Sequence, residues 1–348
     1  MRVRQRRRPG PVAGVSSSLF ATGVTALYFH LMYSTLDQPD VTRRDSRVAV
    51  LLVVTVGLLM QGGSALAVLV IEAVGVVQAL WLRTALAAIV LILVRPRWLR
   101  LPPRGERLPL LSLTLSLLAM NFFFYQAISR VPVGVVVAVE FLGPLSVALA
   151  GSRRVLDVVW VLAAGAGVAL LAGPGGSTTL VGLLFALLAA VCWAAFILSA
   201  KRTVGTMPPM QATVLMLVGA SLVLTPVWLA TGVHVVGQTR ALLLGLAVAV
   251  LSSGLPYFLE LLAISRVRAS TYGVLLSIEP AIAALMGFVV LAQYLVWQEV
   301  AGIFAVVVAA AGASWFAGSP RRRRPPELDP GGNASSSGAP GCENRSPH

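Results

Sequence analysis

The sequence has little of what soluble enzymes use at their surfaces and active sites. Only 11% of its 348 residues are charged, 13 of them acidic, and there are three histidines and two cysteines. The histidines, His30, His234 and His348, lie outside the apolar segments, and no HExxH, paired-cysteine or Ser-His-Asp pattern can be assembled. The Gly173-Pro-Gly-Gly-Ser-Thr loop lacks the lysine of a phosphate-binding loop. We therefore expect no metal and no cofactor, and these absences argue against a hydrolase or an ATP-driven pump.

What the chain does have is long apolar segments. Hydrophobic residues make up 57% of it, and its mean hydropathy is +0.86, far above the values of soluble domains. A helix that crosses a bilayer needs roughly 20 apolar residues. The fold class predicted is an all-α membrane protein with ten transmembrane helices, at 48–70, 75–94, 108–128, 132–151, 155–173, 180–200, 210–231, 240–262, 270–291 and 297–317.

The net charge of +14 would suggest a nucleic-acid partner if the protein were soluble. Here the arginines lie in short connections between apolar segments, where they act as orientation signals and contact anionic lipids. Nearly all of them belong to connections on one side of the predicted membrane, and the other side has only Arg130 and Arg240. This asymmetry predicts an even number of spans with both termini in the cytoplasm, membrane lipids as partners and no nucleic acid.

The ends of the chain differ in composition from the spans. Residues 1–47 are predicted to be a flexible or partly helical cytoplasmic extension, in preference to a signal peptide or an eleventh span, because serines and threonines interrupt their apolar part and no clear cleavage site follows. Residues 318–348 are rich in Pro, Gly and Ser and are predicted to be a disordered cytoplasmic tail.

An internal repeat divides the apolar region. The pentapeptide at 127–131 recurs at 263–267, and the same offset of 136 residues places Pro144 on Pro280 without a gap. The repeat gives two halves, 48–173 and 180–317, with five spans each. Because five is odd, the second half must enter the membrane with the opposite orientation, which is the inverted-repeat arrangement of many secondary transporters.

Prolines predict breaks at matching positions of the two halves. Pro144 cannot donate an amide hydrogen to the carbonyl of Glu140, and Pro280 has the same effect on Leu276. Pro256 is a third candidate break. Broken helices in corresponding positions of two repeats point to a transporter's binding site. A kink required only for packing explains these prolines equally well.

Ionisable residues inside the spans are the main site candidates. Glu140, Glu260 and Glu279 would each cost at least ~2.5 kcal/mol to insert when charged, so such residues are functional candidates by default. The alternative is a protonated carboxyl bonded to a neighbour, or one near a helix end in water. Arg83 could extend to the membrane surface or pair with a glutamate. The polar residues expected to line a cavity with Arg83 are Asn121, Tyr125, Tyr257 and Tyr272.

Several segments carry a family resemblance: Leu82-Arg83, Tyr125-Gln-Ala-Ile-Ser-Arg130, Glu140-Phe-Leu-Gly-Pro144, Ser152-Arg-Arg154 and Asp157-Val-Val-Trp160. Through them the chain resembles the drug/metabolite transporter superfamily, specifically EamA proteins of the threonine and homoserine exporter branch. The resemblance implies ten helices in two inverted EamA repeats, a plasma-membrane location and efflux of a small metabolite by secondary transport. One departure is Val68, at a position where exporters of this branch often have a lysine.

These features predict a secondary active exporter of a small polar metabolite such as an amino acid. It would work by alternating access of its two halves with protons as the coupling ion, and Glu140 would respond to the proton or the solute. Two alternatives stay open: a transporter of another solute class, such as a drug, nucleotide sugar or lipid precursor, and a membrane scaffold that transports nothing. The oligomeric state is left open.

Overall fold

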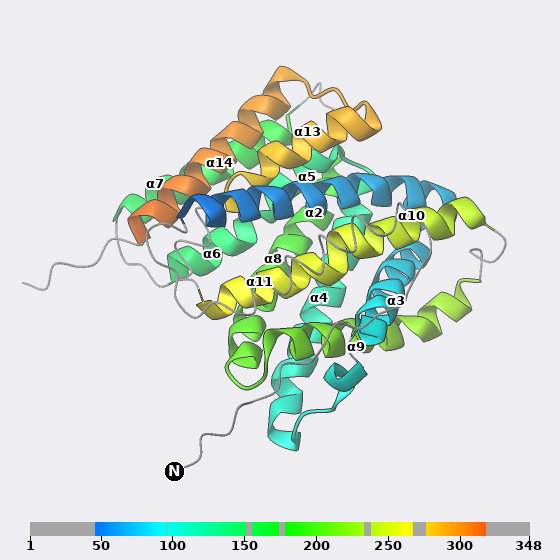
Figure 1. The fold of residues 1–348 in the computed structure, drawn as a ribbon. Helices are drawn as coiled ribbons and strands as arrows, with labels where there is room; N and C mark the ends of the chain where they lie inside the picture. Colours follow the sequence, from blue (N-terminus) through cyan, green and yellow to red (C-terminus); the bar gives the residue numbers. More distant parts are fainter. Residues whose placement is uncertain are drawn as a thin grey trace, which may run out of the picture. The chain divides into compact units, whose positions relative to one another are not determined.

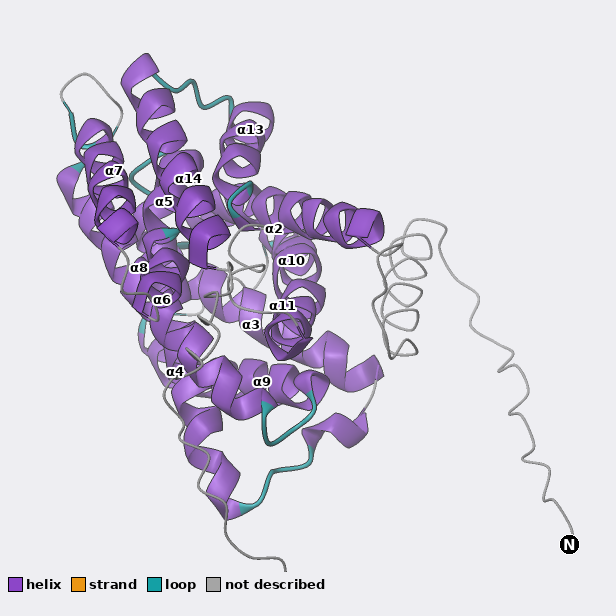
Figure 2. Cartoon of the chain, turned by 90° about the vertical axis from the view of Figure 1, so that its left-hand side faces the viewer, coloured by secondary structure: helices purple, strands orange, loops and turns teal. Residues whose placement is uncertain are grey.

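A computed structural model describes residues 46–94, 96–150, 155–173, 178–232, 238–266 and 276–317. Within these ranges every regular element is a helix and no residue forms a strand (Figure 2). The described part of the chain is therefore all-α, as the sequence predicted. The predicted tail at 318–348 and all but the last two residues of the predicted N-terminal extension lie outside these ranges.

The first half of the described chain forms six α-helices and two short 3₁₀ helices. They are α2 (Ser46–Val74), α3 (Val76–Val94), η2 (Pro96–Leu99), η3 (Arg104–Glu106), α4 (Arg107–Ile128), α5 (Val133–Glu140), α6 (Leu142–Ala150) and α7 (Val155–Leu171). Gly75 separates α2 from α3 with a φ of 85°, a conformation that glycine adopts without a steric penalty. The break between α5 and α6 falls at Phe141, which puts Pro144 in the first turn of α6, where proline is tolerated.

The second half contains a similar succession of helices. They are α8 (Leu180–Val204), α9 (Pro209–Ala230), α10 (Thr239–Ala249), the π-helical η4 (Val250–Gly254), α11 (Leu255–Arg266), α13 (Glu279–Leu291) and α14 (Trp297–Ala317). Pro280 lies in the first turn of α13, immediately after Glu279. The elements α10, η4 and α11 follow one another directly and together cover the predicted eighth span.

Within the described part of the chain, six helical stretches are long and apolar enough to cross a bilayer, judged by length and composition. They are Gly57–Val74, Val76–Leu93, Arg104–Ile128, Leu180–Val204, Pro209–Ala230 and Thr239–Leu261. Four shorter apolar helices lie within the predicted fourth, fifth, ninth and tenth spans: Val133–Val147, Val158–Leu171, Glu279–Leu291 and Trp297–Ala313. Large apolar side chains such as Leu93 and Phe304 are exposed on the outside of the bundle, which suits a lipid surround.

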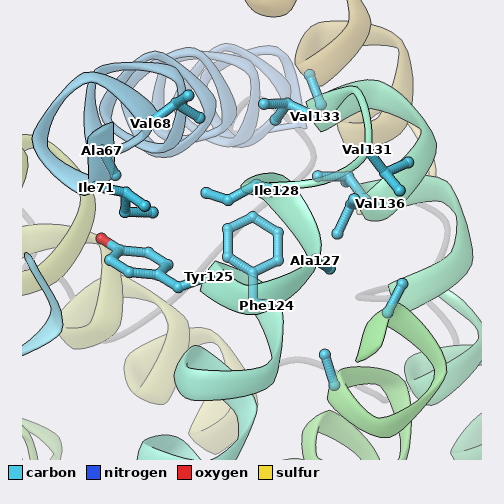
Figure 3. Close-up of a cluster of buried hydrophobic side chains, with 14 of the residues drawn as sticks. Ala67, Val68, Ile71, Phe124, Tyr125, Ala127, Ile128, Val131, Val133 and Val136 are labelled. Carbon is cyan, nitrogen blue, oxygen red and sulfur yellow. The ribbon is translucent and has the colours of Figure 1, made fainter. Parts of the chain in front are cut away.

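Helices distant in sequence pack side by side. The helix α4 lies along α8, α3 along α9 and α7 along α14, while α2 contacts both α10 and α13 (Figure 1). Figure 3 shows part of the core between α2 and α4, where Ala67, Val68 and Ile71 lie beside Tyr125 and Ile128. Val68, where the chain departs from the pattern of the family it resembles, is thus a buried core residue.

Candidate functional site

Arg83, in the middle of α3, points into the helix bundle and is only 3% exposed. Its Nε donates a hydrogen bond of 2.7 Å to Ser253 Oγ, and its Nη2 donates one of 2.6 Å to the carbonyl oxygen of Ser252. The guanidinium therefore bridges α3 to the π-helical η4. The alternative that Arg83 extends to the outer surface is wrong, because its side chain is enclosed by protein.

Two tyrosines flank the same guanidinium. Its Nη2 also donates to the Tyr257 hydroxyl at 3.0 Å, and its Nη1 donates to the Tyr125 hydroxyl at 3.4 Å. The carbon atom Cζ lies 5.5 Å from the centre of each aromatic ring, within the range of cation–π attraction. Tyr125 comes from α4 and Tyr257 from α11, so Arg83 joins three helices at one point.

Pro256 explains why a backbone carbonyl is available to Arg83. In a regular helix the amide of residue 256 would bond to the carbonyl of Ser252, but proline has no amide hydrogen. The helix passes through the π-helical turn η4 immediately before this proline, and π turns occur often at functional sites. The freed oxygen of Ser252 is the atom to which Arg83 donates. A Cβ on Gly63 of α2 would lie 2.6 Å from Ser252 Cβ, so glycine allows α2 to approach this turn.

Asn121 completes the polar network on the α4 side. Its Nδ2 lies 2.9 Å from the Tyr257 hydroxyl, and its Oδ1 lies 3.0 Å from the same hydroxyl. Asn121 Nδ2 also donates to the carbonyl of Leu117 at 2.9 Å. The Tyr257 hydroxyl can thus donate its hydrogen to Asn121 while it accepts one from Arg83. This network fixes the orientation of both side chains around the buried cation.

Three buried carboxyl groups lie near the broken helices. Glu140 is the last residue of α5, Glu279 is the first residue of α13, and Glu260 belongs to α11. Trp193 Nε1 of α8 lies 3.4 Å from Glu260 Oε1. Glu140 is close enough to interact electrostatically with Glu260, Glu279 and Arg83. The bundle therefore encloses one arginine and three glutamates. Among these, Glu140 lies within electrostatic range of the other three residues.

Comparisons with known proteins identify the family. The chain is 38% identical over 258 residues to the threonine/homoserine exporter RhtA of Escherichia coli K12, covering 73% of this chain and 87% of that protein. The RhtA protein of Salmonella typhimurium LT2 matches equally well. A model of the EamA-like transporter family matches residues 180–315. The chain belongs to the EamA family of drug/metabolite transporters, in its RhtA-like branch. It is a multi-pass membrane protein.

A solved structure adds evidence on the fold of this EamA protein. That structure, described only as the crystal structure of a protein, matches with a TM-score of 0.57 at 20% identity, and the match covers 77% of this chain and 98% of the other. The family model covers the half of the chain that supplies the Ser252-Ser253 pair and Tyr257. Arg83, Asn121 and Tyr125 come from the preceding half.

Most of the predicted site residues of this EamA protein fall into two neighbouring groups. Arg83, Asn121, Tyr125 and Tyr257 form one hydrogen-bonded network. Glu140, Glu260 and Glu279 form the acidic group, while the helix-breaking prolines lie in the first turns of α6, α11 and α13. Tyr272 lies outside the described residues.

The sequence did not single out Ser252 or Trp193. A signal for Ser252 was present, because a proline exposes the carbonyl four residues before it, and Pro256 therefore points to this residue. Trp193 had no such signal, since an isolated tryptophan in an apolar helix is typical of packing. Its proximity to Glu260 depends on how α8 and α11 meet.

Proposed function

We propose that this EamA protein is a secondary active exporter of a small polar metabolite, an amino acid of the threonine or homoserine type. The observation that carries the proposal is the buried group of one arginine and three glutamates in a bundle whose relatives are named threonine/homoserine exporters. Ionisable residues inside membrane helices are costly, and they mark solute and proton pathways. A free amino acid carries one charge of each sign, which this mixed group complements.

The proposal includes ten spans in two inverted repeats. With the 136-residue offset, α2 and α3 correspond to α8 and α9, α4 corresponds to α10 through α11, α6 to α13, and α7, with a few residues of drift, to α14. When each helix is replaced by its counterpart in the other half, packed pairs of helices correspond to other packed pairs. The pair α4–α8 corresponds to α10–α2, the pair α3–α10 to α9–α4, and the pair α6–α8 to α13–α2. An inverted repeat requires this pseudosymmetry. The plasma membrane with both termini in the cytoplasm completes the proposed arrangement.

The attachment of the polar network to both halves supports alternating access. Arg83, Asn121 and Tyr125 belong to the first half, whereas Ser252, Ser253 and Tyr257 belong to the second. Any rocking of one half against the other must stretch or exchange the hydrogen bonds between them. Such side chains can change partners within a mostly apolar interface, so they can couple the occupancy of the site to the position of the halves.

Glu140 is the proposed proton- or solute-responsive group. It ends α5 at the break that precedes Pro144, and it is 7% exposed. Glu140 interacts electrostatically with the carboxyl groups of Glu260 and Glu279, and like charges repel strongly where burial has removed water. The entry of an ammonium group would favour the ionised form of a nearby carboxyl, so solute binding and proton release would be linked.

The test is efflux of radiolabelled threonine and homoserine from proteoliposomes that contain the wild-type protein or Glu140→Gln. We expect wild-type efflux to depend on a pH gradient, and Glu140→Gln to transport poorly or without this dependence. Glu72→Gln, which removes an exposed carboxylate at the end of α2, is the matched control and should transport normally. Undiminished, pH-dependent transport by Glu140→Gln would remove Glu140 from the mechanism. Absence of any solute movement by the wild type would favour the scaffold alternative.

A further inference from the structure

Arg83 is a buried cation that donates no hydrogen bond to a carboxylate among the residues that the structure describes. Its four hydrogen-bond acceptors are all neutral: the hydroxyl groups of Ser253, Tyr125 and Tyr257 and the carbonyl of Ser252. A buried charge is costly, and its cost is offset best by an opposite charge with good hydrogen-bond geometry. The neutral acceptors therefore leave this site able to gain from an incoming anion.

The guanidinium also has unused hydrogen-bonding capacity. Arginine has five N–H donors, and only four hydrogen bonds are formed. The contact from Nη1 to Tyr125 is the longest of the four at 3.4 Å, and among the described residues it is the only hydrogen bond that Nη1 makes. The second Nη1 hydrogen has no partner within the described part of the protein. The guanidinium is therefore bound most weakly to its neighbours at Nη1.

The strong and weak contacts of Arg83 lie on different edges. Nε and one Nη2 hydrogen are held by Ser253 and Ser252, which anchor the group to η4. The edge formed by Nη1 and the other Nη2 hydrogen meets only the hydroxyls of Tyr125 and Tyr257. Two parallel N–H groups on one edge are the arrangement that binds a carboxylate in bidentate fashion. Tyrosine hydroxyls can turn to donate to the same carboxylate once it has entered.

We infer that the Nη1–Nη2 edge of Arg83 binds the free carboxylate of the transported solute, with the Tyr125 and Tyr257 hydroxyls closing around it. The inference rests on the proposed function and narrows it to solutes that carry a free carboxylate. The acidic group lies on helices other than α3, and its member Glu140 is within electrostatic range of Arg83. This group would receive the ammonium end of an amino acid. The site would then select zwitterions over amines and esters.

Competition by substrate analogues tests the inference on the unaltered protein. Radiolabelled threonine bound to purified full-length protein in detergent is displaced with unlabelled threonine, threonine amide and threonine methyl ester. Because charge-assisted bidentate hydrogen bonds contribute strongly to affinity, we expect the amide and the ester to compete about 10- to 100-fold less well than threonine. Equal competition by all three compounds would overturn the inference.

Variants provide a second measurement. Arg83→Lys keeps the charge but loses the planar fork, so threonine should bind about tenfold more weakly, and the preference over the amide should shrink. Arg130→Gln is the matched control, because Arg130 is exposed and should leave affinity and preference unchanged. If Arg83→Lys folds and keeps the full preference, Arg83 holds the halves together without touching the carboxylate, and the inference is wrong.

Failure of the inference can be separated from failure of the proposed function. If proteoliposomes move neither threonine nor homoserine, the proposed function fails. The carboxylate site is then tested by thermal unfolding of the wild-type protein. We compare the rise in unfolding temperature caused by 2-hydroxybutyrate with the rise caused by 2-hydroxybutyramide, and the site predicts a larger rise with the acid. Stabilisation by the acid alone that is lost in Arg83→Lys would support the site. Equal stabilisation, or none, would overturn it.

Discussion

Asn121 on α4 and Tyr257 on α11 hydrogen-bond to each other at 2.9 Å although 136 residues separate them along the chain. The same offset separates the pentapeptide at 127–131 from its copy at 263–267. Equivalent residues of two repeats can meet only on the axis that relates the repeats. This contact therefore locates the centre of the proposed pseudosymmetry, and Arg83 lies directly against it.

Removing the Tyr257 hydroxyl should be more harmful than removing both partners of the pair. Tyr257→Phe leaves the buried Oδ1 of Asn121 without its donor and a buried N–H of Arg83 without its acceptor, and each such loss costs about 1–3 kcal/mol. We expect a lower thermal unfolding temperature in detergent and weaker threonine binding. In the double variant Asn121→Leu with Tyr257→Phe, one of these buried polar groups is gone, so part of the stability should return. Tyr294→Phe, at a side chain that is 75% exposed, serves as the control. Additive losses in the double variant would contradict this account.

A methyl group at Gly143 should destabilise the protein. A Cβ there would collide with the backbone carbonyl oxygen of Ala190 on α8, and backbone cannot move aside as a flexible side chain can. Overpacking of this kind costs about 1–3 kcal/mol. We expect Gly143→Ala to lower both the yield of folded protein and its thermal unfolding temperature. Gly165→Ala is the matched control, because its added Cβ would meet open space and should be tolerated. Equal stability of the two variants would contradict the close approach of α6 to α8 at Gly143.

The proposed orientation can be tested with the two natural cysteines, Cys192 and Cys342. In Cys192→Ala, only Cys342 in the C-terminal tail can react. A membrane-impermeant maleimide should label it in inside-out vesicles and spare it in intact spheroplasts. The opposite pattern is expected for Ser177→Cys in a background without both natural cysteines, because the connection after the fifth span should face outward. Labelling of Cys342 from the outside would mean that the proposed orientation is reversed or that the number of spans is odd.

The helix-breaking prolines illustrate what could be read from the sequence. Pro144 and Pro280 were expected to interrupt their helices near Glu140 and Leu276, and the structure ends α5 at Glu140 and begins α13 at Glu279. The rule behind this expectation is local, since a proline removes one amide and affects only the carbonyl four residues before it. Some helix bounds were accessible to within a few residues, such as 108–128 for α4 and 180–200 for α8, because each apolar segment satisfies its own backbone hydrogen bonds.

The hydrogen-bond partners of Arg83 could not be predicted from the sequence. The sequence offered surface extension or a glutamate partner, and the structure instead gives two serines and two tyrosines from three different elements. Which residues meet a buried guanidinium depends on how α3, α4 and η4 cross, and helix crossing depends on side-chain packing along whole interfaces.

The sequence by itself determined that the chain is helical and suited to a membrane, and which of its apolar segments contain ionisable residues. Composition, period and proline position act within a few residues, so they can be read from one segment at a time. Only the tertiary structure decided that Arg83 is enclosed by neutral oxygens and that Asn121 meets Tyr257. Apart from the bond between Arg83 and Tyr125, those contacts join residues more than 100 positions apart, and they exist only because the two halves pack against each other.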